Sequence, residues 1–127
     1  MSVSHVTTHI LDTGAGRPAA GVAVVLYKND GGSWQELAAS TTDADGRAKD
    51  LGPKQLEPGH YKLNFATGSY YAGLQTATFF PEVDLVFEVT GPEHYHVPLL
   101  LSPFAYSTYR GSCTTSVPYH LWSSNRG

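Results

Sequence analysis

The residues most suited to chemistry in this sequence are two histidines separated by a single position, His94 and His96. Successive side chains of a β-strand point to opposite faces, so these two would project from one face, about 6.7 Å apart. Imidazole is the side chain best matched to proton transfer near neutral pH. One strand face would therefore carry two acid–base groups, and the same spacing would also suit a zinc ion bound by both rings.

A second histidine pair lies near the start of the chain. Residues 3–12 alternate as in a strand, which places His5 and His9 on one face. Two strands that each present a histidine pair argue against a merely solvated surface. A zinc site would need a third ligand, but the one cysteine, Cys113, lies near the C-terminus and no acidic residue stands in an obvious ligand position. We therefore expect acid–base chemistry without a metal.

Arg47 follows a turn of the sequence Asp-Ala-Asp-Gly, residues 43–46. Asp and Gly tolerate the left-handed backbone that tight turns require, so the turn is strongly indicated. A guanidinium group held there would form a rigid fork for a planar oxyanion. The competing interpretation is an exposed turn residue without a function.

Thirteen glycines and eight prolines separate short apolar runs, a pattern typical of an all-β sandwich or barrel. The near-continuous apolar run at 22–28 predicts a strand that is buried on both faces, whereas 60–65 and 83–90 alternate cleanly. Seven or eight strands and one short helix suit a two-sheet Greek-key sandwich. The expected strands are 3–12, 22–28, 34–41, 60–65, 83–90 and those within 94–112.

Two segments depart from the strand period. Residues 67–75 predict a helix of two turns, capped by Thr67 or Ser69, with Tyr70, Tyr71 and Leu74 facing inward. Pro98 interrupts the strand that begins at the histidine pair. Because proline has no N–H to donate, that strand needs a bulge or a locally unpaired position there.

Length and charge exclude several classes of function. With 127 residues the chain suggests one domain, and its net charge of −3 without a charged run argues against nucleic acid or an anionic membrane as partner. No apolar stretch reaches the roughly 20 residues that span a bilayer. The first residues lack a secretory signal, and the last three are not a peroxisomal address, so a cytoplasmic protein is expected.

Four motifs occur in an order that resembles the 5-hydroxyisourate hydrolases, the purine-catabolic members of the transthyretin-like family. The last of them ends in Tyr-Arg-Gly-Ser, residues 109–112, which distinguishes these hydrolases from the hormone-carrying transthyretins. The resemblance covers nearly the whole chain before residue 113. The motifs are THILD at 8–12, TDADGR at 42–47, FFPEV at 79–83 and the stretch 94–112.

The resemblance implies a transthyretin-like sandwich of two four-stranded sheets, assembled as a homotetramer, a dimer of dimers, with active sites between the dimers. It implies hydrolysis of 5-hydroxyisourate to 2-oxo-4-hydroxy-4-carboxy-5-ureidoimidazoline, on the route from urate to allantoin, without a cofactor. His94 would be a polar neighbour of the site. The implied catalytic residues are His9, Arg47 and His96, and the substrate-binding residues are Tyr109, Arg110, Gly111 and Ser112.

The sequence continues beyond the family pattern. Residues 1–112 would form the hydrolase domain, whereas 113–127 show no helical or strand period and are expected to be disordered. This extension leaves from the residues that would floor the site. We expect it to bend out through the channel mouth; alternatively, it folds back over the pocket or prevents tetramer assembly.

Three further functions compete with the enzyme. The first is a non-catalytic transthyretin-like carrier of a small ligand, disabled by the extension. A carrier, however, has no need of two facing imidazoles. The second is a zinc-dependent sandwich that uses His94 and His96. The third, a purely structural adhesion-type sandwich, explains none of the clustered histidines.

Overall fold

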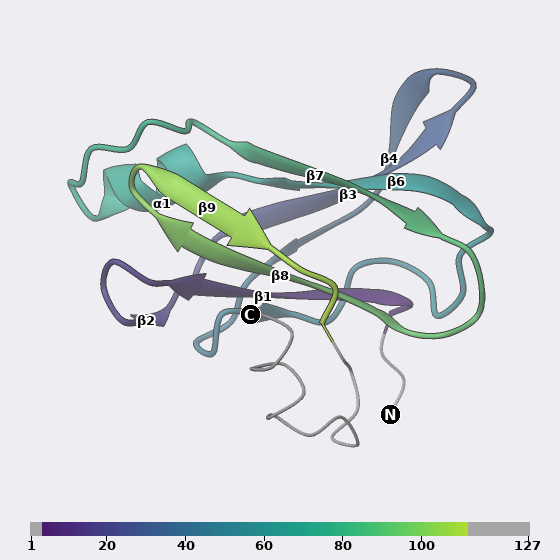
Figure 1. Ribbon diagram of the computed structural model, residues 1–127, viewed down its shortest axis with the longest axis horizontal. Helices are drawn as coiled ribbons and strands as arrows, with labels where there is room; N and C mark the ends of the chain where they lie inside the picture. Colours follow the sequence, from purple (N-terminus) through teal and green to yellow (C-terminus); the bar gives the residue numbers. More distant parts are fainter. Residues whose placement is uncertain (1–3, 112–127) are drawn as a thin grey trace, which may run out of the picture.

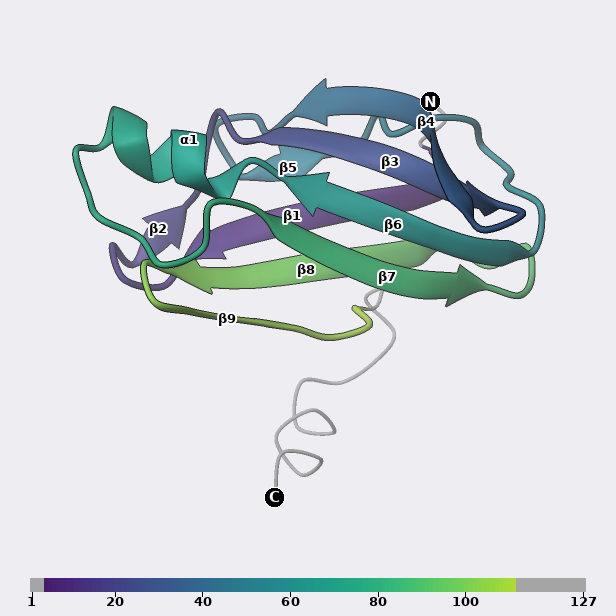
Figure 2. The ribbon, with the colours of Figure 1, turned by 90° about the horizontal axis from the view of Figure 1, so that it is seen from above.

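The computed structural model describes residues 4–111, which fold into two packed β-sheets and one short helix (Figure 1). Viewed from above, the sheets form two layers, with the helix α1 at one end (Figure 2). The predicted two-sheet sandwich is therefore confirmed. One sheet has the order β2 (Arg17–Pro18), β1 (Val6–Asp12), β8 (Tyr95–Ser102), β9 (Ala105–Thr108), with β5 (Arg47–Ala48) also on β1; the other has the order β4 (Ser33–Thr41), β3 (Ala23–Asp30), β6 (Gly59–Phe65), β7 (Val83–Val89).

The prediction of seven or eight strands was wrong, because nine strands lie within the described residues. The extra strands, β2 and β5, have only two residues each, too few to show a side-chain period in the sequence. Both pair with β1, so that the sheet with β1 has five strands instead of four. One pairing in this sheet, that of β1 with β8, is parallel.

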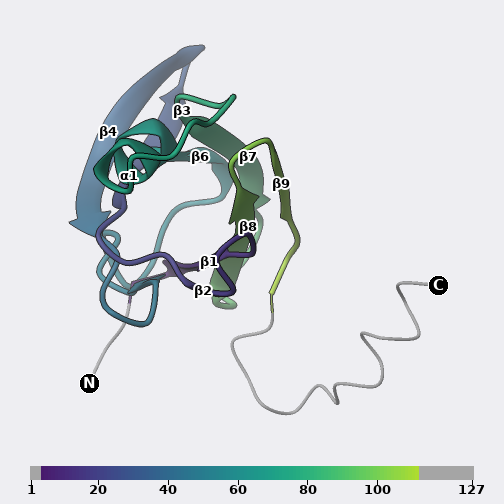
Figure 3. The same ribbon diagram turned by 90° about the vertical axis from the view of Figure 1, so that its left-hand side faces the viewer.

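The core lies between the sheets, as the end-on view shows (Figure 3). Alternate residues of β1, β3, β6, β7 and β8 supply most of it; Ile10 in β1, Leu63 in β6 and Leu99 in β8 have no exposed surface. The prediction that both faces of 22–28 are buried was wrong. In β3, Val24 and Leu26 face the core, but the side chains between them remain partly exposed because only one face of the sheet is covered.

Pro98 leaves a gap in the pairing of β8 with β9, as expected of a residue without an N–H. The paired run ends at Leu99, opposite Thr108, and pairing resumes with a single bridge between His96 and Gly111. From the first pair to the second, the position on each strand changes by three residues. The antiparallel register is therefore the same on both sides of the gap, and no bulge is present between these two pairs. The side facing β1 is unaffected, since Pro98 is there the partner of His9.

The helix α1 (Thr67–Gly73) has the predicted two-turn length but not the predicted cap. Ala66 is the N-cap residue and contributes no side-chain hydrogen bond. Thr67 is the first residue of the helix; it is buried, and its hydroxyl donates to the Phe80 carbonyl. Tyr71 faces inward as expected, whereas Leu74 is exposed. Within residues 4–111 no helix is long or apolar enough to cross a membrane.

Asp12 joins this helix to the end of β1. It is buried, and its carboxylate accepts hydrogen bonds from the Tyr70 hydroxyl at 2.8 Å and the Ala15 N–H at 3.0 Å. Tyr71 approaches the other side of the group at 3.5 Å. Burial, together with this carboxylate, raises the pKa of Tyr70 to about 12, so its hydroxyl stays a donor at neutral pH.

We predict that Asp12→Ala lowers the free energy of unfolding by about 3 kcal/mol, because it leaves buried hydroxyls without an acceptor. Urea denaturation measures this change. Asp50→Ala removes an exposed carboxylate and serves as the matched control, with an effect of about 0.5 kcal/mol or less. Equal effects of the two substitutions would contradict the anchoring role of Asp12.

Candidate active site

The outer face of the β1–β8 sheet gathers the polar residues singled out in the sequence. The parallel register makes Thr7 the partner of His96. His9 is two residues after Thr7 on β1, so its side chain lies on the same face. In the antiparallel pairing of β1 with β5, His9 lies directly opposite Arg47. Directly paired residues share a face of the sheet, so three neighbouring strands bring His9, His96 and Arg47 together.

The turn before β5 fixes both Arg47 and His9. Asp43 Oδ1 accepts hydrogen bonds from the N–H groups of Asp45 and Arg47, at 2.9 and 3.0 Å, which shapes the turn. His9 Nε2 lies 2.9 Å from the Asp45 carbonyl oxygen. A carbonyl only accepts, so Nε2 carries a proton and Nδ1 is the nitrogen with the free lone pair in neutral His9.

Gly46 is required for the close approach of this turn to β1. Its φ of +77° is in the left-handed region, and its N–H donates to the Asp43 carbonyl. A Cβ at this position would collide with the Ile10 carbonyl oxygen. The glycine thus allows the turn to lie against β1 and Arg47 to face His9.

The imidazole of His96 is held on two sides. Its Nδ1 lies 2.9 Å from the Thr7 hydroxyl, and Gly111 packs against the Cδ2 edge of the ring. A Cβ on Gly111 would lie only 2.8 Å from that ring atom, so a larger residue would displace the ring. Nε2 is the ring nitrogen left to act on a substrate.

Both imidazoles are electrically neutral at pH 7. Burial is the main cause that lowers the pKa of His96 to about 4, and the Arg47 guanidinium and the neighbouring histidines lower it further. The pKa of His9 is also below its ordinary value, again through burial first and Arg47 second. The face therefore presents two unprotonated bases beside one permanent cation.

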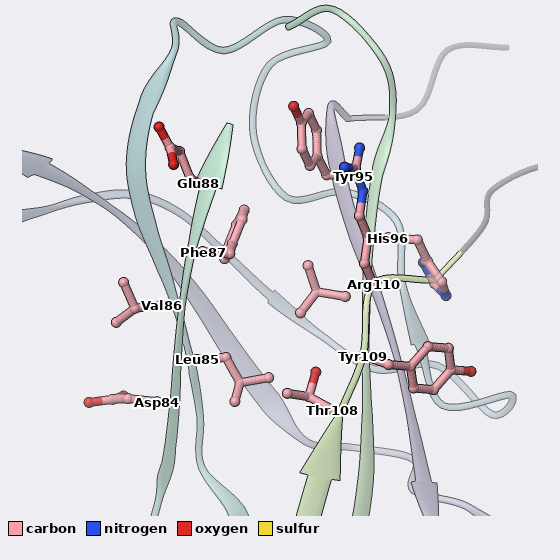
Figure 4. Close-up of a pocket in the computed structure, with 11 residues that line it drawn as sticks. Asp84, Leu85, Val86, Phe87, Glu88, Tyr95, His96, Thr108, Tyr109 and Arg110 are labelled. Atoms are coloured by element: carbon pink, nitrogen blue, oxygen red, sulfur yellow. The ribbon is translucent and has the colours of Figure 1, made fainter. Parts of the chain in front are cut away.

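The C-terminal residues of the predicted site divide between the two faces. The register of β8 with β9 places Tyr109 and Gly111 on the His96 side, and Figure 4 shows Tyr109 and His96 pointing the same way. Arg110 points to the other side, where its guanidinium lies 4.5 Å from the centre of the Tyr95 ring. It is also 3.5 Å from a Glu93 oxygen. Ser112 lies outside the described residues.

A groove of about 410 Å³ lies on this other side, between β7 and the β8–β9 pair (Figure 4). His96 and Arg110 line it, but His9 and Arg47 do not. The groove and the acid–base face are therefore separate features that meet at β8. We place the chemistry on the face, because that is where the two imidazoles and the cation converge.

His5 does not join His9, contrary to the expectation that the two share a face. It is buried, and the Leu56 N–H donates to its Nδ1 at 2.8 Å. Its Nε2 consequently carries the proton and donates to the Glu93 carbonyl, also at 2.8 Å. Both ring nitrogens are used in tying loops together, so His5 has a structural role.

His94 and His96 share one face as predicted, but they do so around a hydroxyl group. Thr7 Oγ1 lies 2.8 Å from His94 Nε2 and 2.9 Å from His96 Nδ1. Among residues 4–111 no three histidine, cysteine or acidic side chains group as metal ligands. Sequence reasoning missed Thr7, although its alternation with His9 along β1 was the available signal.

Comparison with known proteins gives a consistent result. The model of the HIUase/Transthyretin family matches residues 6–111. The 5-hydroxyisourate hydrolase of Salmonella typhimurium is 49% identical over 108 residues, covering 84% of this chain and 79% of that protein. The mouse protein of the same name is 45% identical over 113 residues, covering 86% and 96%.

The solved structures that resemble this fold include both a 5-hydroxyisourate hydrolase and a transthyretin. The 5-hydroxyisourate hydrolase of Klebsiella pneumoniae matches with a TM-score of 0.76 and 36% identity, covering 84% of this chain and 98% of that one. Sea bream transthyretin in complex with thyroxine matches with a TM-score of 0.80 and 32% identity, covering 89% and 98%. The backbone alone therefore does not separate an enzyme from a carrier.

We predict that Arg47→Gln raises the pKa of both His96 and His9, because it removes a nearby positive charge that disfavours their protonation. NMR titration of the histidine side chains measures the shift. Arg17→Gln changes an exposed arginine of β2, opposite Asp12 at the far end of β1, and is the matched control that should leave both values unchanged. An unchanged His96 titration in Arg47→Gln would contradict the electrostatic coupling.

Proposed function

Because this chain belongs to the HIUase/Transthyretin family, we propose that it is a hydrolase that opens the ring of 5-hydroxyisourate in urate degradation. The product would be 2-oxo-4-hydroxy-4-carboxy-5-ureidoimidazoline. The observation that carries the proposal is the convergence of His9, His96 and Arg47 on one face. Relatives named for this activity match along most of the chain.

The two imidazoles have different roles in this proposal. One takes a proton from water as the water attacks the ring carbonyl and then passes that proton to the departing ring nitrogen, whereas the other accepts a hydrogen bond from the water and orients it. The atoms in reach are Nδ1 of His9 and Nε2 of His96, since the opposite nitrogens face Asp45 and Thr7. Their lowered pKa values keep both rings unprotonated before the substrate binds.

Arg47 stabilises the negative charge that develops on the carbonyl oxygen. Its side chain is exposed beside His9, so a bound substrate reaches it without displacing protein groups. Tyr109 and Gly111 border this face and would bind the planar substrate. Ser112, outside the described residues, is proposed as a further substrate-binding residue. Arg110 contributes indirectly, because its contacts with Tyr95 and Glu93 anchor the segment after β9.

The carrier alternative is not favoured. A transthyretin-like backbone is compatible with ligand carriage, as the sea bream structure with thyroxine illustrates. The named hydrolases, however, are the more similar relatives in sequence, at 45–49% identity. Two neutral imidazoles beside a cation suit proton transfer better than the binding of a hydrophobic hormone.

We also propose that the enzyme is a homotetramer, a dimer of dimers, as the family resemblance implies. The catalytic face is open in one chain, so a second copy would supply the opposite wall. The strands β7 and β9 lie at the ends of their sheets and expose the apolar side chains Val86 and Tyr106, which suits strand pairing between copies. Light scattering coupled to gel filtration measures the assembly.

The hydrolase domain would extend over residues 1–112, and the extension 113–127 would leave the channel without blocking it. The extension lies outside the described residues. We propose a cytoplasmic location, since a single cysteine makes no intrachain disulfide and so gives no sign of an oxidising compartment. No cofactor or metal has a part in the proposed reaction.

We predict that His9→Gln and His96→Gln each slow hydroxyisourate decay by about 10²–10⁴-fold, the usual contribution of a general acid or base. The substrate is generated in situ from urate and followed in the ultraviolet. The acid limb of each variant's pH–rate profile identifies the base, because removing the base removes the limb that its protonation causes. Identical residual profiles would contradict a division of labour.

His60→Gln is the matched control, because His60 is exposed on β6 in the other sheet. It should retain the rate of the unmodified chain. A chain truncated after Ser112 separates the site from the extension. Equal rates for the full and truncated chains would support both the proposed chemistry and the harmless extension, and no acceleration by either would contradict the proposed function.

A further inference from the structure

Thr7 has an unusual position for a threonine, because two histidine nitrogens approach its hydroxyl. Its Oγ1 lies 2.8 Å from His94 Nε2 and 2.9 Å from His96 Nδ1. The side chain is buried, whereas both imidazoles are only partly buried. The hydroxyl therefore lies beneath the two rings and is shielded from water that would otherwise compete for its hydrogen bonds.

A hydroxyl group has one proton, so it donates to only one of the two nitrogens and accepts from the other. If Thr7 donates to His94, His96 must carry its proton on Nδ1, and its Nε2 is free to act as a base. If Thr7 donates to His96, then His96 carries its proton on Nε2 and His94 donates to Thr7. The two arrangements exclude each other, so the tautomer of one neutral ring determines that of the other.

We propose that Thr7 is a positioning residue that couples the tautomers of His94 and His96 and passes protons between them. This inference rests on the proposed hydrolase function. The coupling assigns His94 a part in the reaction, as the outer end of a three-residue relay. His94 is thus more than the polar neighbour that the sequence suggested.

The relay balances its protons at each step. When His96 Nε2 takes a proton from water, the Nδ1 proton of His96 moves to the Thr7 oxygen. The Thr7 hydroxyl proton moves at the same time to His94 Nε2, which leaves His94 as the cation. His94 then releases the proton on its Nδ1 to solvent, and His96 remains neutral with its proton on Nε2.

The charges around the two rings favour transfer from His96 to His94. Burial lowers the pKa of both, but His96 also lies near the Arg47 cation, so charge is less costly on His94. His5 is the histidine that lowers the pKa of His94. The other titratable or charged groups around His96 and its groove are His9 on β1, Asp84 and Glu88 on β7, Tyr95 on β8, and Tyr109 and Arg110 after β9.

The kinetic test compares Thr7→Val, which removes the hydroxyl at nearly constant shape, with Thr7→Ser, which keeps it. Thr7→Val should lower kcat by about tenfold with little change in KM, since Thr7 does not touch the substrate. Thr7→Ser should remain within about threefold of the original kcat. Thr41→Val, an exposed threonine on β4, is the matched control and should have no effect.

Double substitution then tests the relay itself. His94→Leu should lower kcat about as much as Thr7→Val, and the double variant should lose about tenfold rather than about a hundredfold, because both changes break one chain. Additive losses would overturn the proposal. A serine variant as slow as the valine variant would also overturn it, since the hydroxyl would then not be the relevant group.

A spectroscopic measurement keeps the test independent of activity. With ¹⁵N-labelled histidine, the His94 and His96 ring signals of the unmodified chain should respond together to pH, and in Thr7→Val they should respond separately. Separate responses in the unmodified chain would overturn the coupling. If the rings respond together but hydroxyisourate decay is not accelerated, the coupling stands as a property of the fold while the proposed hydrolase function fails.

Discussion

The structure depends on the parallel register of β1 with β8, which pairs residues 6–12 with residues 95–101. Val6, Ile10, Leu99 and Leu101 are fully buried on the core side of these strands. Burying each is worth about 1.5–3 kcal/mol, and a slip of either strand by one residue would turn that strand's pair outward. The same register sets Thr7 beside His96 on the opposite face. Apolar packing therefore determines where the acid–base groups meet.

The chemistry of the acid–base face depends on the lowered pKa values of its two imidazoles. His9 and His96 share the face with Arg47, and burial together with this cation keeps both rings unprotonated. An acidic neighbour would have the opposite effect and would favour imidazolium. Asp43 and Asp45 in the turn do raise the pKa of His9, but burial and Arg47 outweigh them. The Asp43 carboxylate also accepts hydrogen bonds from backbone N–H groups, which lower its pKa and hold Arg47 in place. Turn geometry and catalytic electrostatics are thus parts of one local arrangement.

Much of this arrangement could be predicted from the sequence, because side-chain alternation and turn residues are local signals. The sandwich, the two-turn helix and the shared face of His94 and His96 belong to that class. Features that depend on distant partners could not be predicted. The pairing of β5 with β1, the inward turn of His5 and the opposite directions of Tyr109 and Arg110 all require the register of other strands. Thr7 was missed because its role arises only when β8 lies beside it.

The most direct test of this account is the pH dependence of kcat/KM for hydroxyisourate hydrolysis by the full chain, which reports the pKa values of the free enzyme. The ordinary pKa of histidine is 6.5, and both catalytic rings are held below it. The account predicts that activity persists as the pH falls through 6.5 and is lost only at lower values. A loss of activity with a midpoint at or above pH 6.5 would contradict the claim that two neutral imidazoles with lowered pKa values perform the reaction.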